Sequence, residues 1–360
     1  MAEGKSEGSI SLKIELTLLS PFQLNDQLTL TNRIVMAPMT RSMANDQLVA
    51  TKEMAAYYAR RSAVGLLISE GTVIRRDGYG YPNVPGIYTQ QQIDGWKRVT
   101  EAVHKNDGKI FAQLWHVGRV SHPIYLGGEL PVAPSAVPLK GILSRRKDLE
   151  YGMPRALALS EIPMIVEAFA EAGANAIQAG FDGIEIHGAN GYLVDQFLHH
   201  NTNRRKDNYG GSIENMARFA IEVVKAISDE IGPQRVGVRL SPGAYHYIEP
   251  DERDPEVFKY LLQQLNLLEI AYVHTGIFDD SMQFDYLSGT ATSFLREHYT
   301  GTVIGCGSYT IESAAQAIAN GEFDLIAIGR LLIANPNLVE KIRAGKELIP
   351  YDKAMLKTLH

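Results

Sequence analysis

The chain has a single cysteine among its 360 residues, Cys306. One thiol cannot form an internal disulfide. It also cannot supply the four thiolates of an iron–sulfur cluster or of an all-cysteine zinc site. The lone cysteine therefore excludes both kinds of framework within this chain, and it is typical of a protein kept in a reducing compartment.

Long apolar runs and an excess of positive charge are lacking as well. No apolar stretch is long enough to span a bilayer, and residues 1–16 show neither the apolar core nor the cleavage pattern of a secretory signal. The net charge is −6, the pI is near 6.0 and no stripe of Lys and Arg occurs, which argues against a nucleic-acid partner. These absences predict a soluble cytoplasmic protein without membrane attachment.

The composition is that of an ordinary globular protein, with 45% apolar and 21% charged residues, and it can bury a sizeable core. Short runs that are apolar on both faces recur along the chain. Such runs are typical of parallel strands buried on both sides. They occupy residues 33–37, 65–70, 109–114, 183–187, 235–240, 270–274, 302–305 and 325–329.

Amphipathic stretches with helical spacing alternate with these runs, and Ser160 and Ser212 stand where helix N-caps are expected. The stretches are residues 51–62, 89–106, 160–179, 212–231, 254–266, 289–297, 310–320 and 335–344. Eight strands, each followed by a helix, predict an α/β fold of the (β/α)8 TIM-barrel type. No linker composition divides the chain, so we expect one domain over residues 1–360.

Two segments do not fit the alternation. Residues 21–31 have the pattern of a small hairpin before the first strand, where it could close the far end of the barrel. Residues 116–159 form a long stretch rich in Gly, Pro and Ser with no clear helix. Loops of this length in a compact domain are usually functional. Because this one follows the third strand, we expect it at the catalytic mouth.

Chemistry in a TIM barrel lies where the strands end, so the residues at those positions matter most. Gly307 and Ser308 follow the seventh strand, and Gly329 and Arg330 follow the eighth. Glycines at a helix N-terminus let backbone N–H groups approach a phosphate, and an arginine adds forked donors with a fixed charge. The pattern favours a phosphate site over the alternative of plain turn glycines and a surface arginine.

His187, Asn190 and Tyr192 follow the fourth strand. An imidazole and an amide aimed at one oxygen atom could polarise a carbonyl or nitro group, and the phenol could deliver a proton to carbon. The same residues could instead be a core histidine, a turn-capping asparagine and a packed tyrosine. Their spacing alone leaves both interpretations open.

Other strand ends carry polar groups suited to a flat heteroaromatic ligand. Gln113 offers an amide donor and acceptor, Arg239 a cation and Thr40 a hydroxyl. Each of these residues by itself is weak evidence for a binding site. Gathered around one mouth with a phosphate site, they fit an isoalloxazine ring, which a protein binds, orients and tunes.

These strand-end motifs resemble the old yellow enzyme family, on its enoate-reductase branch, and the resemblance spans residues 20–340. The matching segments are NRIVMAPMTR (32–41), SEGT (69–72), AQLWHVGR (112–119), FDGIEIHGANGYLVDQFLHHNTNRRKDNYGGSIENMARF (181–219), VRLSP (238–242), GCGSYT (305–310) and IGRLLIANPNL (328–338).

The resemblance implies FMN as cofactor and NAD(P)H as co-substrate in a ping-pong cycle that reduces small activated alkenes by hydride transfer from flavin N5. It implies contacts to the flavin ring and ribityl chain from Pro38, Met39, Thr40, Gly71, Gln113 and Arg239, and to the phosphate from Gly307, Ser308, Gly329 and Arg330. His187 and Asn190 would hold the activating group, and Tyr192 would protonate the α-carbon. Tyr79 and Trp115 would lie beside the substrate and the flavin.

The chain departs from the family pattern in places. Met216 stands where relatives commonly have Arg, and Asn190 stands where some have His. The sequence after Asn337 lacks the Gly- and Tyr-rich tail that helps to wall the site in many relatives, which leaves Tyr351 as a candidate replacement. The sequence leaves open the preference for NADPH or NADH, the acceptor (enone, nitroalkene, maleimide or nitrate ester), and whether the protein is a monomer or a homodimer.

The chain lacks the residues that other enzymes built on this barrel need. A dienoyl-CoA reductase needs a cysteine cluster, a metal-dependent hydrolase needs histidines where strand one ends in Pro-Met-Thr, and a Schiff-base aldolase needs a lysine at a strand's carboxyl end. No metal site is therefore predicted. A flavoprotein that binds FMN without reducing alkenes remains the alternative from a different class.

Overall fold

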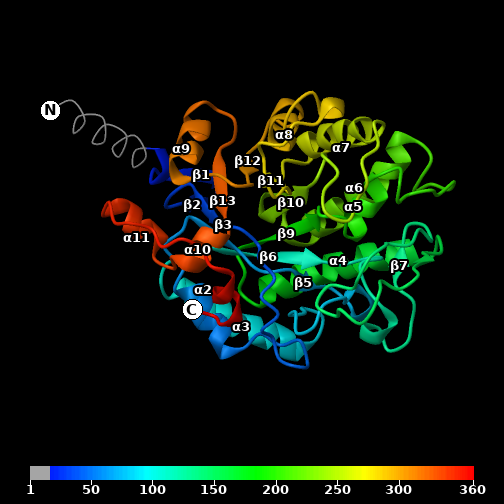
Figure 1. Ribbon diagram of the computed structural model, residues 1–360, viewed down its shortest axis with the longest axis horizontal. Coiled ribbons are helices and arrows are strands. Elements are labelled where there is room, and N and C mark those ends of the chain that lie inside the picture. Colours follow the sequence, from blue (N-terminus) through cyan, green and yellow to red (C-terminus); the bar gives the residue numbers. More distant parts are fainter. Residues whose placement is uncertain (1–16) are drawn as a thin grey trace.

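Eight parallel strands form a closed ring in the computed structural model, which describes residues 17–360 (Figure 1). The ring runs in the order β4-β3-β13-β12-β11-β10-β9-β6 and closes through β4 and β6. Its strands are β3 (Ile34–Met36), β4 (Leu66–Ile68), β6 (Ile110–Trp115), β9 (Gly183–Gly188), β10 (Val236–Leu240), β11 (Tyr272–Thr275), β12 (Val303–Gly305) and β13 (Leu325–Ile328). All eight predicted strands and the TIM-barrel fold are confirmed.

Every residue of these eight strands is buried, as their two-sided apolar sequences require. Side chains such as Val35, Phe111, Tyr272 and Ile304 fill the inside of the ring. A short extra strand, β5 (Thr72–Val73), pairs with the carboxyl end of β6, opposite Leu114 and Trp115. It extends the sheet at the end where the site lies.

The predicted hairpin consists of β1 (Phe22–Asn25) and β2 (Leu28–Leu30), which pair antiparallel. Leu24 and Leu30 belong to the same apolar cluster as the side chains inside the ring. The hairpin therefore closes the amino-terminal end of the barrel, as expected, and leaves the carboxyl-terminal end as the open mouth.

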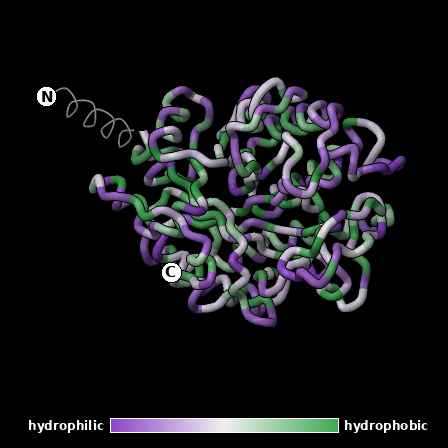
Figure 2. The backbone as a smooth tube through the Cα atoms, in the orientation of Figure 1, coloured by the Kyte–Doolittle hydropathy of each residue, from purple (hydrophilic) through white to green (hydrophobic). Residues whose placement is uncertain are grey.

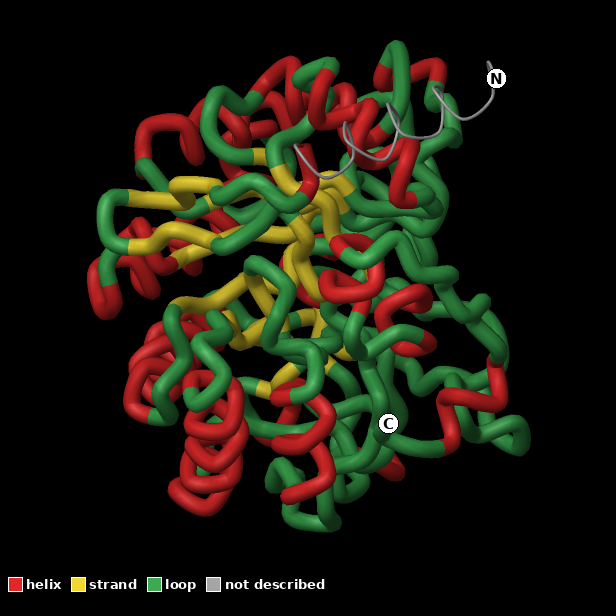
Figure 3. Tube along the Cα trace, turned by 90° about the vertical axis from the view of Figure 1, so that its left-hand side faces the viewer, coloured by secondary structure: helices red, strands yellow, loops and turns green. Residues whose placement is uncertain are grey.

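Helices surround the ring, so that strands lie in the centre and helices outside (Figure 3). Many hydrophilic residues lie on the outer loops (Figure 2). The long helices are α2 (Lys52–Ala59), α3 (Gln90–His104), α4 (Glu161–Gln178), α6 (Ile213–Ile231), α7 (Asp254–Leu268), α8 (Ala291–His298) and α9 (Ile311–Ala319), with the shorter α5 (Leu193–Leu198), α10 (Arg330–Ala334) and α11 (Leu338–Arg343). Two of the short helices, α5 and α10, were not predicted.

The two expected serine caps have different outcomes. Ser212 accepts the N–H of Asn215 at 3.2 Å and caps α6. Ser160 occupies the N-cap position of α4 as expected but makes no capping hydrogen bond, while Glu161 accepts the N–H of Ala158 at 2.7 Å and pairs with Arg155. The bond to Ala158 holds the backbone just before the helix, and a carboxylate in the first turn also complements the helix dipole.

The long segment after β6 is largely irregular, as predicted. It contains a short turn of helix, η2 (Pro123–Tyr125), and the strand β7 (Val132–Ala133), which pairs with β8 (Arg155–Ala156). This segment has a small apolar core of its own, formed by Tyr125, Leu126 and Leu143. Arg119 donates to the backbone oxygen of Tyr247 at 2.8 Å, which ties the segment to the loop after β10 at the mouth.

No helix between residues 17 and 360 has the length and apolar character needed to cross a membrane. The expectation that the chain lacks a secretory signal concerns residues 1–16, which lie outside the described residues.

Candidate active site

A cavity of about 610 Å³ opens at the carboxyl ends of the strands. It brings together residues from the ends of β3, β9, β10, β12 and β13, although these are far apart in the sequence. The predicted site residues that line it are Met39, Asn190, Arg239, Gly307, Ser308, Gly329 and Arg330. Strand-end residues thus converge where the barrel geometry requires.

The side of the cavity after β12 and β13 is built from close backbone turns. Gly307 has φ +117°, and a Cβ there would lie 2.7 Å from the backbone nitrogen of Asp280. Ser308 is left-handed as well, with φ 60°, and its Oγ donates to the backbone oxygen of Phe278 at 3.0 Å. The Arg330 guanidinium lies 4.5 Å from the centroid of the Phe278 ring. This side offers close backbone and one cation, which suits a phosphate.

The predicted residues at the ends of β3 and β4 lie next to this wall. Met39 lines the cavity, and its sulfur is 3.1 Å from where a Cβ on Gly329 would stand. A Cβ on Gly71 would lie 2.4 Å from the Trp115 ring, so only glycine fits beneath that indole. Pro38, Thr40 and Gly71 are not among the residues that line the cavity itself.

A buried polar network lies behind the cavity and includes three residues that sequence reasoning missed. Glu185 accepts from Gln113 at 2.9 Å, from Tyr272 at 3.0 Å and from His274 at 2.8 Å. Burial raises the pKa of Glu185, but the facing His274, the charge of Arg239 and the Gln113 hydrogen bond together outweigh burial, so that the pKa is lowered overall. Because Glu185 stays ionised, it fixes the orientation of the Gln113 amide. Arg239 lies beside this network, and its Nε donates to the backbone oxygen of Thr275 at 3.3 Å.

His187 lies at the end of β9 among aromatic rings. Its ring centroid is 4.8 Å from that of Tyr192 and 6.1 Å from that of Trp115. Burial, followed by the charge of Arg239, holds the pKa of His187 well below its ordinary value. The imidazole is therefore neutral. Its Nδ1 is buried and has no hydrogen-bond partner among residues 17–360, so the ring can still bind an incoming polar atom.

A chain of hydrogen-bonded tyrosine hydroxyls lies beside His187. The Tyr192 hydroxyl is 2.8 Å from that of Tyr81, which is 3.2 Å from that of Tyr247, and Tyr151 donates to Tyr247 at 3.1 Å. Burial, together with the neighbouring Tyr247, raises the pKa of Tyr192 far above its ordinary value. Tyr192 therefore stays protonated, and its hydrogen-bonded chain can resupply a proton that it gives away.

Of the two tyrosines in residues 77–82, Tyr81 rather than Tyr79 lies beside Tyr192. The Tyr81 ring stacks on Trp115 with centroids 5.2 Å apart, whereas the Tyr79 ring packs against Tyr125 at 5.3 Å. The resemblance to the family implied Tyr79, and the two tyrosines occur within one short motif. Only the direction of each side chain distinguishes them.

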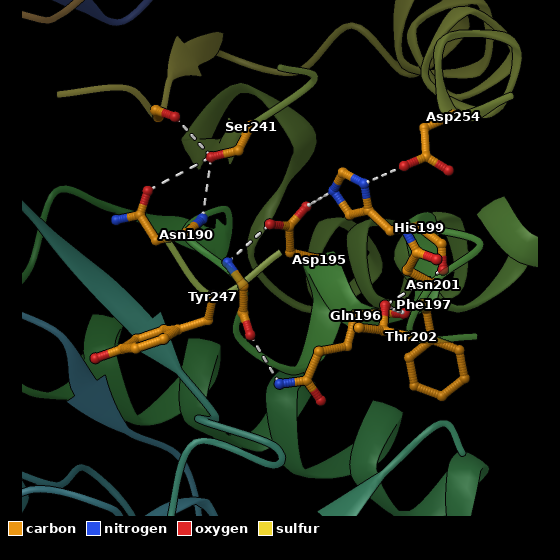
Figure 4. A network of polar contacts seen from close by, with 12 residues as sticks. Asn190, Asp195, Gln196, Phe197, His199, Asn201, Thr202, Ser241, Tyr247 and Asp254 are labelled. Carbon is orange, nitrogen blue, oxygen red and sulfur yellow. Dashed lines mark hydrogen bonds and ion pairs between the residues drawn. The ribbon is translucent and has the colours of Figure 1, made fainter. Parts of the chain in front are cut away.

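A hydrogen bond from its backbone N–H fixes the position of Asn190. It is left-handed, with φ 59°, and its N–H donates to Ser241 Oγ at 3.0 Å, while that hydroxyl donates to the backbone oxygen of Gly276 at 2.6 Å (Figure 4). The Asn190 side chain lines the cavity. The structure thus brings an amide, a neutral imidazole and a protonated phenol to the end of one strand.

The C-terminal residues also reach the site. Tyr351 lines the cavity together with Leu348. Arg41, which follows the β3 end, donates to the backbone oxygen of Thr358 at 2.7 Å, and Arg60 donates to that of Leu359 at 2.6 Å. These bonds hold the tail beside α2 (Figure 1).

The chain matches known proteins over nearly its whole length. The model of the NADH:flavin oxidoreductase / NADH oxidase family matches residues 17–348. A curated relative, 12-oxophytodienoate reductase 7 of Oryza sativa subsp. japonica, is 42% identical over 93% of this chain and 89% of its own.

Solved structures agree with this match. Morphinone reductase in complex with tetrahydroNAD superposes with a TM-score of 0.86 at 40% identity, over 94% of this chain and 93% of the other. The old yellow enzyme homologue of Zymomonas mobilis gives 0.88 at 36% identity, over 94% and 96%. With the barrel and the strand-end site described above, these matches establish that the chain belongs to the NADH:flavin oxidoreductase / NADH oxidase family, which includes the old yellow enzymes, and that it is an NAD(P)H-dependent flavin oxidoreductase with FMN as cofactor.

Proposed function

We propose that this enzyme reduces carbon–carbon double bonds activated by a neighbouring carbonyl or nitro group. The observation that carries the proposal is the grouping of His187, Asn190 and Tyr192 at the end of β9, beside the cavity and with no hydrogen bond from the His187 ring to another residue of the described chain. The relatives named above are reductases of organic molecules, which supports the same chemistry.

The residues present fit FMN. Gly307 leaves room that a Cβ would fill, and Arg330 supplies a fixed cation for the phosphate, with Ser308 and Gly329 next to them. Arg239, Gln113 and Met39 offer a cation, an oriented amide and an apolar contact for the ring, with Pro38, Thr40 and Gly71 at neighbouring strand ends. When bound, FMN supplies the hydride that NAD(P)H has delivered to it.

The protein's part in the reaction is to bind and polarise the acceptor and to supply a proton. Addition of hydride to the β-carbon pushes negative charge onto the oxygen of the activating group. The neutral His187 and the Asn190 amide donate hydrogen bonds to that oxygen as its charge develops. Tyr192, kept protonated by burial, gives its proton to the α-carbon, and Tyr81 holds the phenol in place at 2.8 Å. We therefore assign to Tyr81 the place beside the substrate that the resemblance implied for Tyr79, while Trp115 forms the wall behind the Tyr81 and Tyr192 rings.

Visible absorption of the purified, FMN-loaded protein tests the proposal. NADPH should bleach the flavin under anaerobic conditions, and cyclohexenone or a nitroalkene should restore the colour. Tyr192→Phe should slow the recolouring by about two orders of magnitude, the usual size of a general-acid contribution, and should leave bleaching nearly unchanged. A protein that bleaches but that no activated alkene recolours would be a flavoprotein of another function. Equal slowing of both steps in Tyr192→Phe would remove Tyr192 as the acid.

A further inference from the structure

Behind the site lies a buried ion cluster that the proposed reaction does not use. His199 Nε2 is 2.8 Å from Asp195 Oδ1, and its Nδ1 is 2.7 Å from Asp254 Oδ2 (Figure 4). The three side chains are almost completely buried. A ring that faces a carboxylate oxygen from both nitrogens must donate from both, so His199 is an imidazolium. Burial alone would lower its pKa, but Asp195 and Asp254 outweigh burial and raise it to about 10.

The cluster reaches the site through one glycine. The second oxygen of Asp195 accepts the N–H of Gly191 at 2.8 Å, and Gln196 Nε2 donates to the Gly191 carbonyl at 2.8 Å. Two consecutive side chains of α5 thus hold both backbone polar groups of a single residue. A Cβ on Gly191 would lie 2.6 Å from the Cβ of Tyr247, so the peptide is confined from a third side.

Gly191 lies between Asn190 and Tyr192, two of the three proposed site residues. Asn190 and Gly191 are both left-handed, with φ 59° and 79°. A non-glycine residue rarely adopts this region and persists there only where its surroundings hold it. Rotation of the peptide at Gly191 would turn the Asn190 amide and the Tyr192 phenol away from a common target.

Charge explains why a histidine stands at the centre of the cluster. Burial raises the pKa of Asp195 overall, and His199 limits that rise, because its positive charge favours the ionised carboxylate that accepts the Gly191 N–H. Asp254 is the first residue of α7, where the helix dipole stabilises an anion, and it holds the other side of the imidazolium. His199 therefore connects the turn at Gly191 to a long helix that does not touch the substrate.

We propose that Asp195, Gln196 and His199 are positioning residues for alkene reduction, which fix the Asn190–Gly191 turn so that the Asn190 amide and the Tyr192 phenol face one substrate. This inference rests on the function proposed above. It assigns to a buried ion cluster the task of holding two reacting side chains through the backbone between them.

Asp195→Asn tests the inference in the FMN-loaded enzyme, and Asp182→Asn is the matched control. Asp182 also accepts one backbone N–H, that of Ile110 at 2.8 Å, and also pairs with a histidine, His104 at 2.9 Å, but at the opposite end of β9. Asp195→Asn should slow cyclohexenone-driven recolouring by about tenfold to a hundredfold, the effect of a displaced reacting group. It should also weaken binding of 4-hydroxybenzaldehyde, a phenol followed by its effect on the flavin spectrum, by about tenfold.

Asp182→Asn should lower the melting temperature without changing either quantity by more than about twofold. If Asp195→Asn retains the wild-type recolouring rate and phenol affinity, or if Asp182→Asn loses them equally, the inference is wrong. Should Asp195→Asn fail to fold, Gln196→Met must show the same two losses. This variant adds no charge and removes the hydrogen bond to the Gly191 carbonyl, together with the two longer bonds of Gln196 to the backbone of Val117 and Arg119. A wild-type enzyme that no alkene recolours would overturn the proposed function instead, and phenol binding would still test the turn.

Discussion

The two ends of the barrel satisfy their polar groups in different ways. At the amino-terminal end, Asp182 accepts the N–H of Ile110 and Asp324 accepts that of Val303, so acidic side chains complete hydrogen bonds where strands begin. At the carboxyl-terminal mouth, Trp115 Nε1, His187 Nδ1 and His274 Nε2 are buried without a partner among residues 17–360. Buried polar groups in native proteins almost always find partners. Two hydroxyls near the strand starts, Ser62 Oγ and Ser228 Oγ, lack partners within the same range as well. The ends therefore differ in kind, because the unpaired groups of the mouth are ring nitrogens that can hold a ligand.

The two ends of the barrel also differ in where left-handed backbone conformations occur. Near the amino-terminal end, left-handed residues such as Glu269, with φ 51°, end helices, which is a common way to stop one. At the mouth, Asn190 and Ser308 are left-handed within the loops that line the cavity. Strain at such positions usually serves the placement of functional groups. At the mouth, the left-handed residues thus shape loops around the cavity and do not end helices.

The largest expected effect comes from removing the unsatisfied imidazole at the mouth. His187→Ala should lower kcat/KM for an enone by about a hundredfold to a thousandfold, because a donor to the developing oxyanion is lost. Steady-state kinetics with cyclohexenone measures this change. His104→Ala, at the amino-terminal end, serves as the control and should leave kcat/KM unchanged. Wild-type kinetics in His187→Ala would show that the unpaired imidazole nitrogen has no part in the reaction.

A smaller effect should follow from filling the turn after β12. Gly307→Ala places a Cβ 2.7 Å from the Asp280 nitrogen at φ +117°, so the loop must shift. We expect FMN affinity to fall by about tenfold, since strain of this kind costs on the order of 1–3 kcal/mol. Fluorescence titration of the apoprotein measures it. Gly321→Ala is the control, with a left-handed φ of +77° but open space around it, and it should bind FMN normally. Equal affinity in all three proteins would refute the phosphate role of this turn.

The smallest effect is expected where strands begin. Asp324 accepts the Val303 N–H at 2.9 Å and pairs with Arg296 at 3.0 Å. Asp324→Asn should reduce the free energy of unfolding by about 1 kcal/mol, the usual net value of a hydrogen bond, with kcat/KM unchanged. Urea denaturation monitored by circular dichroism gives the first quantity. A marked loss of turnover there would break the division between a structural end and a reactive end.

Much of this division could be predicted from the sequence. Apolar runs that must be buried on both faces predicted all eight strands and the closed ring, and the pattern of residues 21–31 predicted the hairpin of Phe22–Asn25 and Leu28–Leu30. The residues at strand ends predicted the cavity wall at Gly307, Ser308, Gly329 and Arg330. Closure of a barrel forces strand ends together, so position along the chain was enough to group them.

Side-chain direction was beyond the reach of the sequence. Tyr79 and Tyr81 share one motif, yet only Tyr81 reaches Tyr192. The short α5 was missed because its six residues are too few to show a helical period.

The sequence by itself determined the periodic burial that makes a barrel and the polar residues that stand at its strand ends. Only the tertiary structure decided which phenol meets which, that Glu185 faces His274, and that His199 joins Asp195 to Asp254. The physical reason is that burial follows from local hydropathy, whereas a hydrogen bond requires two atoms within about 3 Å of each other. That distance is set by the packing of segments far apart in the chain.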